Sequence, residues 1–145
     1  MRPSVWAEKS IVLPDDSAHP GTYQNRIVPY AAGIMDASFF PSVQEIVICA
    51  PSQTGKTTIV NNCLGYAMDR APGNAVVTYP DEVTAKDNAK DRMLPMINLS
   101  PKLREYKTGY EDDEGSTKIK MSIMILYMAW ANSASRLANR PAPYG

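Results

Sequence analysis

Ala50-Pro51-Ser52-Gln53-Thr54-Gly55-Lys56-Thr57 fits the A/G-x-x-x-x-G-K-[ST] pattern of a phosphate-binding loop (P-loop, Walker A), with alanine where the first glycine usually stands. The stretch follows a short apolar run at 45–49 and precedes a segment with the apolar spacing of a helix. Strand, loop and helix in this order are the context that such a loop requires. The stretch therefore predicts a nucleotide-binding site at the start of a helix.

The residue types of this loop suit the chemistry of a polyphosphate. Backbone N–H groups at a helix N-terminus, together with the helix dipole, attract negative charge. Gly55 permits a close approach of the backbone, Lys56 can contact the β- and γ-phosphates as the candidate catalytic residue, and Thr57 can ligate Mg²⁺. We expect the nucleotide to be bound by Ser52, Gln53, Thr54, Gly55, Lys56, Thr57 and Thr58.

Composition limits the other possibilities. The chain has 145 residues, enough for one domain, and its 15 basic residues balance its 15 acidic ones, so no bulk field draws it onto nucleic acid or a membrane. Cys49 and Cys63 are predicted to be small buried apolar residues without a disulfide or metal role. Neither a membrane-spanning run nor an amino-terminal signal core is found, so we expect a cytoplasmic protein.

Residues 1–43 form an irregular arm that five prolines interrupt. Its aromatic residues have two interpretations. They either pack the arm against the core, or one of them, Tyr30 or Tyr23, stacks on a nucleotide base, with Gln24 or Arg26 hydrogen-bonded nearby.

From residue 44 the pattern becomes regular. The apolar run 46–49 predicts a central strand of a parallel sheet, 56–70 a helix with one apolar face, and 75–79 the next strand, which together make a βαβ unit. Asp81 is expected to cap another helix, which Pro95 should end or kink. The fold class indicated is α/β, with a parallel sheet flanked by helices and a P-loop.

The remaining segments are less regular. Ser100-Pro101 predicts a second helix start, 111–114 an acidic turn, and 119–130 either one kinked strand or two short ones. Residues 133–139 are expected to form a short helix. The helix that begins at Asp81 carries charges of both signs, which are interpreted as a solvated face. These charged residues are Asp81, Glu82, Lys86, Asp87, Lys90, Asp91 and Arg92.

A spaced set of short motifs runs through most of the chain. In order, they are Trp6-Ala7-Glu8, Pro29-Tyr30, Met35-Asp36, Ser52-Gln53-Thr54-Gly55-Lys56-Thr57, Asn61-Asn62, Gly65-Tyr66, Pro80, Lys90-Asp91-Arg92-Met93-Leu94-Pro95-Met96-Ile97, Ser100-Pro101, Ala131-Asn132-Ser133 and Leu137-Ala138-Asn139-Arg140-Pro141. With this set the chain resembles the GpA-like large subunits of tailed-phage terminases, the ATP-driven motors that package viral DNA.

The resemblance implies a RecA-like ATPase domain followed by a nuclease domain. It implies ATP and Mg²⁺ as cofactors, with Gly55, Lys56 and Thr57 as the residues that bind the ATP phosphates and Mg²⁺. It also places Trp6 and Tyr30 in the region where such motors hold the adenine. The implied partners are double-stranded viral DNA, a small terminase subunit and the portal of the procapsid, with a homo-oligomeric ring as the working assembly.

The sequence departs from the family where the catalytic carboxylates would follow. In the family an Arg-Pro segment runs into a strand that ends in Asp-Glu (Walker B), whereas this sequence stops at Gly145. We therefore expect an arm at 1–43 and the amino-terminal portion of the ATPase domain at 44–145, which binds ATP weakly and does not hydrolyse it. The alternatives are a helicase-like ATPase acting on nucleic acid, a nucleotide or small-molecule kinase, and an inactive truncated prophage remnant.

Overall fold

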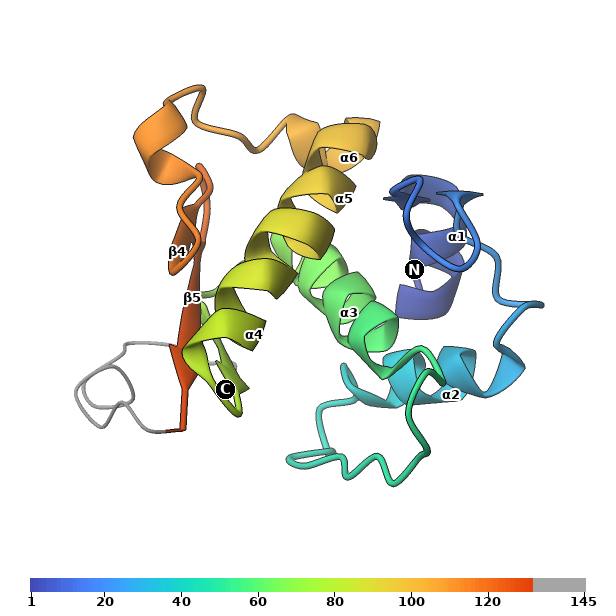
Figure 1. Cartoon of the computed structure of the whole chain (residues 1–145). Coiled ribbons are helices and arrows are strands. Elements are labelled where there is room, and N and C mark those ends of the chain that lie inside the picture. The colour runs from blue at the N-terminus through green and yellow to red at the C-terminus, as the bar shows by residue number, and fades with distance from the viewer. Residues whose placement is uncertain (132–145) are drawn as a thin grey trace.

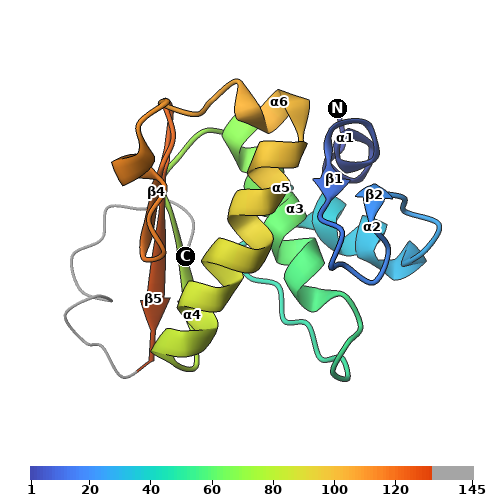
Figure 2. The ribbon, with the colours of Figure 1, turned by 45° about the horizontal axis from the view of Figure 1, so that its top comes forward.

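The computed structural model of the chain describes residues 1–131 as helices packed on one side of a small sheet (Figures 1 and 2). The helix expected at 133–139 lies outside the described residues. The elements in chain order are α1 (Pro3–Ser10), β1 (Val12–Leu13), β2 (Gly21–Thr22), α2 (Pro29–Ala37), α3 (Lys56–Arg70), β3 (Ala75–Tyr79), α4 (Glu82–Asn88), the π-helical turn η1 (Ala89–Met93), α5 (Leu94–Leu99), α6 (Pro101–Arg104), the 3-10 turn η2 (Glu111–Asp113), β4 (Lys118–Lys120) and β5 (Ile125–Trp130).

The main sheet has the strand order β3-β5-β4 and is mixed. Strand β3 pairs in parallel with β5, from Ala75 opposite Leu126 to Tyr79 opposite Trp130. Strands β4 and β5 form an antiparallel hairpin, so of the two alternatives expected for 119–130 the two short strands are the one observed. The fold is therefore mixed α/β, as expected, while its parallel part comprises one strand pair among the described residues.

The strand expected at 46–49 is absent from the described structure. This segment is irregular and belongs to the long connection between α2 and α3, the lower loop of Figure 1. Val47 is 82% exposed, and Cys49 is exposed rather than buried. An apolar β-branched run becomes a strand only where a neighbouring strand satisfies its backbone groups, and no described strand pairs with this run. The βαβ unit expected around α3 is therefore not formed by the described residues.

Pro95 does not end its helix. The helix continues through α4, η1 and α5 from Glu82 to Leu99, and these three elements together are called the long helix below (Figure 2). A proline inside an α-helix lacks an N–H and its ring clashes with the carbonyl four residues earlier. Here the turn before it is π-helical, with the Leu94 N–H bonded to Ala89 O. This wider turn accommodates the proline. At the start of the helix, Asp81 is the expected cap and accepts a 2.8 Å hydrogen bond from Thr84 N.

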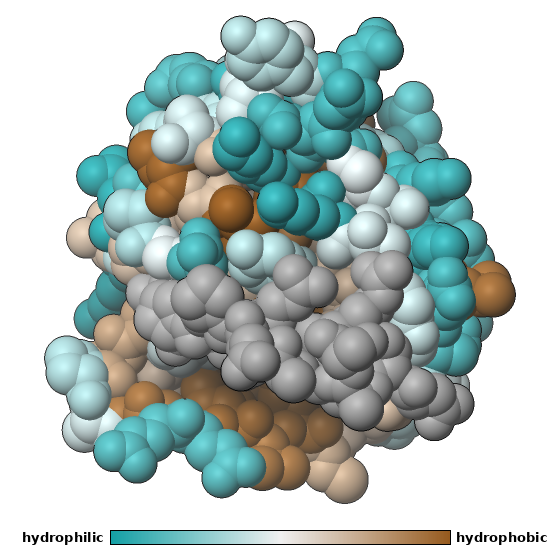
Figure 3. Space-filling model, turned by 90° about the vertical axis from the view of Figure 1, so that its left-hand side faces the viewer, coloured by the Kyte–Doolittle hydropathy of each residue, from teal (hydrophilic) through white to brown (hydrophobic). Residues whose placement is uncertain are grey.

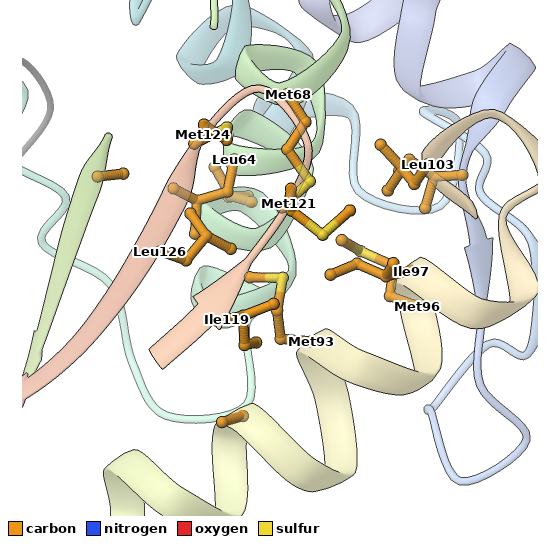
Figure 4. Close-up of a cluster of buried hydrophobic side chains, with 14 of the residues drawn as sticks. Leu64, Met68, Met93, Met96, Ile97, Leu103, Ile119, Met121, Met124 and Leu126 are labelled. Carbon is orange, nitrogen blue, oxygen red and sulfur yellow. The ribbon is translucent and has the colours of Figure 1, made fainter. Parts of the chain in front are cut away.

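Methionine fills much of the core between α3, the long helix and the β4–β5 hairpin (Figure 4). An unbranched thioether adapts to irregular gaps, which suits a core built from elements that cross at several angles. The buried side chains labelled in Figure 4 are Leu64, Met68, Met93, Met96, Ile97, Leu103, Ile119, Met121, Met124 and Leu126. Seen from the sheet side, the described surface is largely polar, with an apolar area at its lower end (Figure 3).

Helix α3 packs closely against the amino-terminal segment at Gly65. A Cβ at this position would lie 3.2 Å from both Ile11 Cδ1 and Trp6 Cη2, and 3.4 Å from Leu103 Cδ1. Overpacking of this kind costs about 1–3 kcal/mol, which exceeds the helix propensity gained on replacing glycine. We therefore expect Gly65→Ala to lower the free energy of unfolding by about 1 kcal/mol.

Gly33 of α2 is the matched control, because a Cβ there has no atom within 4 Å. Gly33→Ala should raise the free energy of unfolding by about 0.5–1 kcal/mol through helix propensity alone. Urea denaturation of both variants measures the contrast. If both substitutions raised the free energy of unfolding equally, Ile11 and Trp6 would leave room for a Cβ at position 65.

Candidate functional site

Loop 50–57 ends in a left-handed turn that leads directly into α3. Gly55 is the residue before the helix and has a φ of 80°, a conformation that favours glycine. Gln53 also has a positive φ, of 58°, which is uncommon for a residue with a side chain. The first backbone N–H groups of α3 are thereby presented at the end of the loop rather than buried within it.

Lys56 is bound by the loop that it follows. Its Nζ donates hydrogen bonds of 2.6 Å to both Ala50 O and Pro51 O, and Thr54 Oγ1 donates to Pro51 O at 2.8 Å. The lysine and the threonine together hold the loop in a closed turn. A phosphate group entering here would offer anionic oxygens as alternative acceptors for the same ammonium group.

Tyr30 connects α2 to the loop. Its hydroxyl donates a 2.5 Å hydrogen bond to Thr54 O, and its side chain remains half exposed. Because α2 packs against α3, this contact sets the position of the loop relative to the first turn of α3. Tyr30 is thus attached to the loop itself, while its stacking on a nucleotide base stays a prediction.

A cavity of about 1060 Å³ opens beside the loop. Most of the predicted site residues line it: Tyr30, Gln53, Thr54, Gly55, Lys56, Thr57 and Thr58. Tyr23 and Gln24 line it as well, whereas Ser52 does not. Arg26 also lies outside the lining, and its Nε donates a 2.6 Å hydrogen bond to Gln24 Oε1.

Trp6 does not reach the cavity, although the resemblance placed it near the adenine. Its side chain is 1% exposed and lies in the core, where its Nε1 donates a 2.7 Å hydrogen bond to Asp69 Oδ2. Asp69 belongs to the last turn of α3 and also accepts a 2.6 Å hydrogen bond from the Tyr106 hydroxyl. These bonds attach α1 and the segment after α6 to the helix that begins at the loop.

One face of the long helix forms another wall of the cavity, and sequence reasoning missed it. Its members recur at helical spacing and are Thr84, Asp87, Asn88, Asp91 and Arg92. The charged members were interpreted as part of a solvated face, and they are indeed exposed or half-buried. One sequence signal could have identified these residues as part of a site. Their polar stripe lies directly beside the buried apolar stripe of Ala85, Ala89 and Met93.

The cavity carries charges of both signs. Its carboxylates come from Asp16, Asp87 and Asp91, and its cations from Lys56 and Arg92. Among residues 1–131, no group of three or more His, Cys, Asp or Glu side chains is arranged to hold a metal ion by itself. A cation bound here would therefore need ligands from the phosphate as well as from the protein.

The acidic turn at 111–114 takes no part in this cavity. Residues Glu111–Asp113 form the exposed turn η2 next to β4, as the sequence indicated. Glu114 is paired with Lys107, with 2.7 Å between Lys107 Nζ and Glu114 Oε1. These carboxylates are structural or solvated.

Fold and site together describe an α/β protein with a glycine-lysine-threonine turn at a helix N-terminus beside a large polar cavity. The chain belongs to the family of the ATPase domain of phage terminase large subunit gpA, whose family model matches residues 17–144. This match confirms the resemblance that the spaced motifs indicated, and the family implies use of a nucleotide. No curated protein and no solved structure matches the chain. Within residues 1–131, no helix is both long and apolar enough to cross a membrane.

Proposed function

We propose that this chain is the ATP-binding portion of a phage DNA-packaging motor, in which hydrolysis of ATP drives DNA into a procapsid. The observation that carries the proposal is the position of Gly55, Lys56 and Thr57 at the start of α3, beside a cavity of about 1060 Å³. A cavity of roughly 300–1,000 Å³ is usual for a ligand of drug size, so a nucleotide fits. Family membership supplies the link to packaging.

In this proposal each part of the loop has a distinct role. The backbone N–H groups after Gly55 bind phosphate oxygens at the positive end of the α3 dipole. Lys56 releases the carbonyls of Ala50 and Pro51 and binds the β- and γ-phosphates. Thr57, which lines the cavity, is the residue that fits as a ligand of Mg²⁺, and the metal would neutralise phosphate charge.

The wider assembly is also part of the proposal. Double-stranded viral DNA, a small terminase subunit and the procapsid portal are the partners, and several copies of the complete motor surround the DNA. Residues 1–43 would serve as an arm leading into the ATPase core at 44–145. Support for the arm comes from α1, which packs against α2 and α3 and so stabilises the helix behind the loop.

Calorimetric titration of Mg²⁺-ATP into the wild-type chain and Lys56→Ala tests the proposal. We expect binding by the wild type and about 10- to 150-fold weaker binding by the variant, since a hydrogen bond to a charged group contributes about 1.5–3 kcal/mol. Lys90→Ala is the matched control, because Lys90 is exposed and does not line the cavity. Equal affinity of the wild type and Lys56→Ala would contradict the proposal.

Phosphate release measured in the same samples answers a separate question. We expect no turnover, because hydrolysis needs a carboxylate that positions water and the metal, and within residues 1–131 no group of three or more such side chains is arranged to hold a metal ion by itself. Turnover by the wild-type chain would instead indicate that a cavity carboxylate, Asp87 or Asp91, fills that role. Asp87→Asn and Asp91→Asn would then identify which one.

A further inference from the structure

Arg92 is the only cation on the face of the long helix that lines the cavity, as far as the described residues show. It lies on η1, and Lys56 and Thr57 lie on the neighbouring wall. Arg92, Thr57 and Thr58 also line a second void of about 10 Å³, so the Arg92 side chain adjoins the first turn of α3. Two elements far apart in the sequence thus each place a cation beside the same helix N-terminus.

The Arg92 side chain is available to a ligand. It is exposed, and within residues 1–131 it forms no hydrogen bond or salt bridge, even though Asp87 and Asp91 line the same cavity. Lys56, by contrast, is held by two carbonyls of its own loop. The cavity therefore contains one cation engaged with the protein and one that is free to bind an anion.

Arg92 lies in the π-helical turn η1, which positions its side chain at the cavity. Such turns contain one more residue than an α-helical turn and are frequent at functional sites. In η1 the turn keeps Met93 fully buried in the core while the preceding residue lines the cavity. The same turn accommodates Pro95, so the helix continues from Glu82 to Leu99, and Thr84, Asp87, Asn88, Asp91 and Arg92 all line the cavity.

We propose that Arg92 binds the terminal phosphate of the nucleoside triphosphate held by loop 50–57, as a second cation beside Lys56. A planar guanidinium donates two parallel hydrogen bonds to phosphate oxygens, a geometry that an ammonium group cannot reproduce. Its charge also offsets the carboxylates of Asp87 and Asp91, which would otherwise repel the phosphates. This inference rests on the proposed function and adds selection of the triphosphate over the diphosphate.

Calorimetry with Mg²⁺-ATP, Mg²⁺-ADP and inorganic tripolyphosphate tests the inference on the wild type, Arg92→Ala and Arg92→Lys. For Arg92→Ala we expect about tenfold weaker binding of ATP and of tripolyphosphate, equivalent to about 1.4 kcal/mol, and a smaller loss for ADP. Arg92→Lys should bind ATP more tightly than Arg92→Ala but less tightly than the wild type, because lysine keeps the positive charge and lacks the two parallel N–H donors of the guanidinium. Thermal unfolding should be unchanged in both variants, since the side chain is exposed.

Lys90→Ala provides the matched control, because Lys90 belongs to the same turn, has the same charge and does not line the cavity. If Arg92→Ala binds ATP like the wild type while Lys56→Ala does not, the inference is wrong and the proposed function stands. If Lys90→Ala weakens binding as much as Arg92→Ala, the effect is one of general charge and the inference is again wrong. If the wild type binds none of the three ligands, both proposals fail.

Discussion

Trp6→Ala is expected to lower the free energy of unfolding by about 3–5 kcal/mol, the usual range for truncating a buried tryptophan. The indole is 1% exposed and packs edge-on against Tyr66 of α3, with the ring centroids 5.7 Å apart at 85°. It also contacts the position of Gly65 and donates its N–H to Asp69. Its removal leaves a cavity between α1 and α3 and removes one hydrogen bond from Asp69 Oδ2, which still has Arg70 Nε at 2.8 Å.

Urea denaturation followed by far-ultraviolet circular dichroism measures this loss without depending on tryptophan fluorescence. Val5→Ala is the control, since Val5 is the neighbouring residue of α1 and is 39% exposed; its effect should stay below about 0.5 kcal/mol. Trp6→Phe should fall between the two because it keeps an aromatic ring and loses the N–H donor. A change below about 1 kcal/mol in Trp6→Ala would mean that α1 is not part of the cooperative core.

Asp69→Ala is expected to lower the free energy of unfolding by about 3 kcal/mol. The carboxylate is 3% exposed and accepts hydrogen bonds from Trp6 Nε1 and the Tyr106 hydroxyl, while Arg70 Nε lies 2.8 Å from it. Its loss leaves two donors without an acceptor at the junction of three segments. The same denaturation experiment measures the effect, and Asp112→Ala, at an exposed position, should change little.

The pH dependence of stability gives an independent check on Asp69. Burial alone would raise the pKa of this carboxyl, but hydrogen bonds from Tyr106 and Trp6 and the charges of Arg70 and Lys102 outweigh it and lower the pKa below its ordinary value of 3.8. Because the folded pKa is depressed, the stabilisation is present above pH 3.8 and is lost as the pH falls through the lower folded value.

Asp69→Asn should therefore show a smaller loss of stability on acidification below about pH 4 than the wild type. Urea midpoints from pH 7 down to pH 2.5 measure this difference, and the two curves should converge at the acidic end. Parallel curves over the whole range would show that the carboxylate is not held in its charged form by the fold.

Part of the site could be predicted from the sequence because it is contiguous. Residues 50–57 contain the loop, the glycine with positive φ and the start of α3 in one local stretch, and six of the seven predicted residues that line the cavity lie at 53–58. The cavity wall from α4 and η1 could not be predicted. Asp87, Asp91 and Arg92 reach it only because the long helix crosses α3, and a charged stripe on a helix ordinarily indicates solvent.

The sequence by itself determined the helices, strands and caps that depend only on residues close to one another in the chain. The apolar stripe of α3 (Lys56–Arg70), the strand β3 (Ala75–Tyr79) and the Asp81 cap appear where periodicity and capping place them. The tertiary structure decided three matters: that 46–49 pairs with no strand among residues 1–131, that Trp6 is buried against Asp69, and that a π-turn carries the helix past Pro95. Each depends on groups distant in sequence, since strand pairing, burial and the crossing of helices are set by contacts that no local pattern contains.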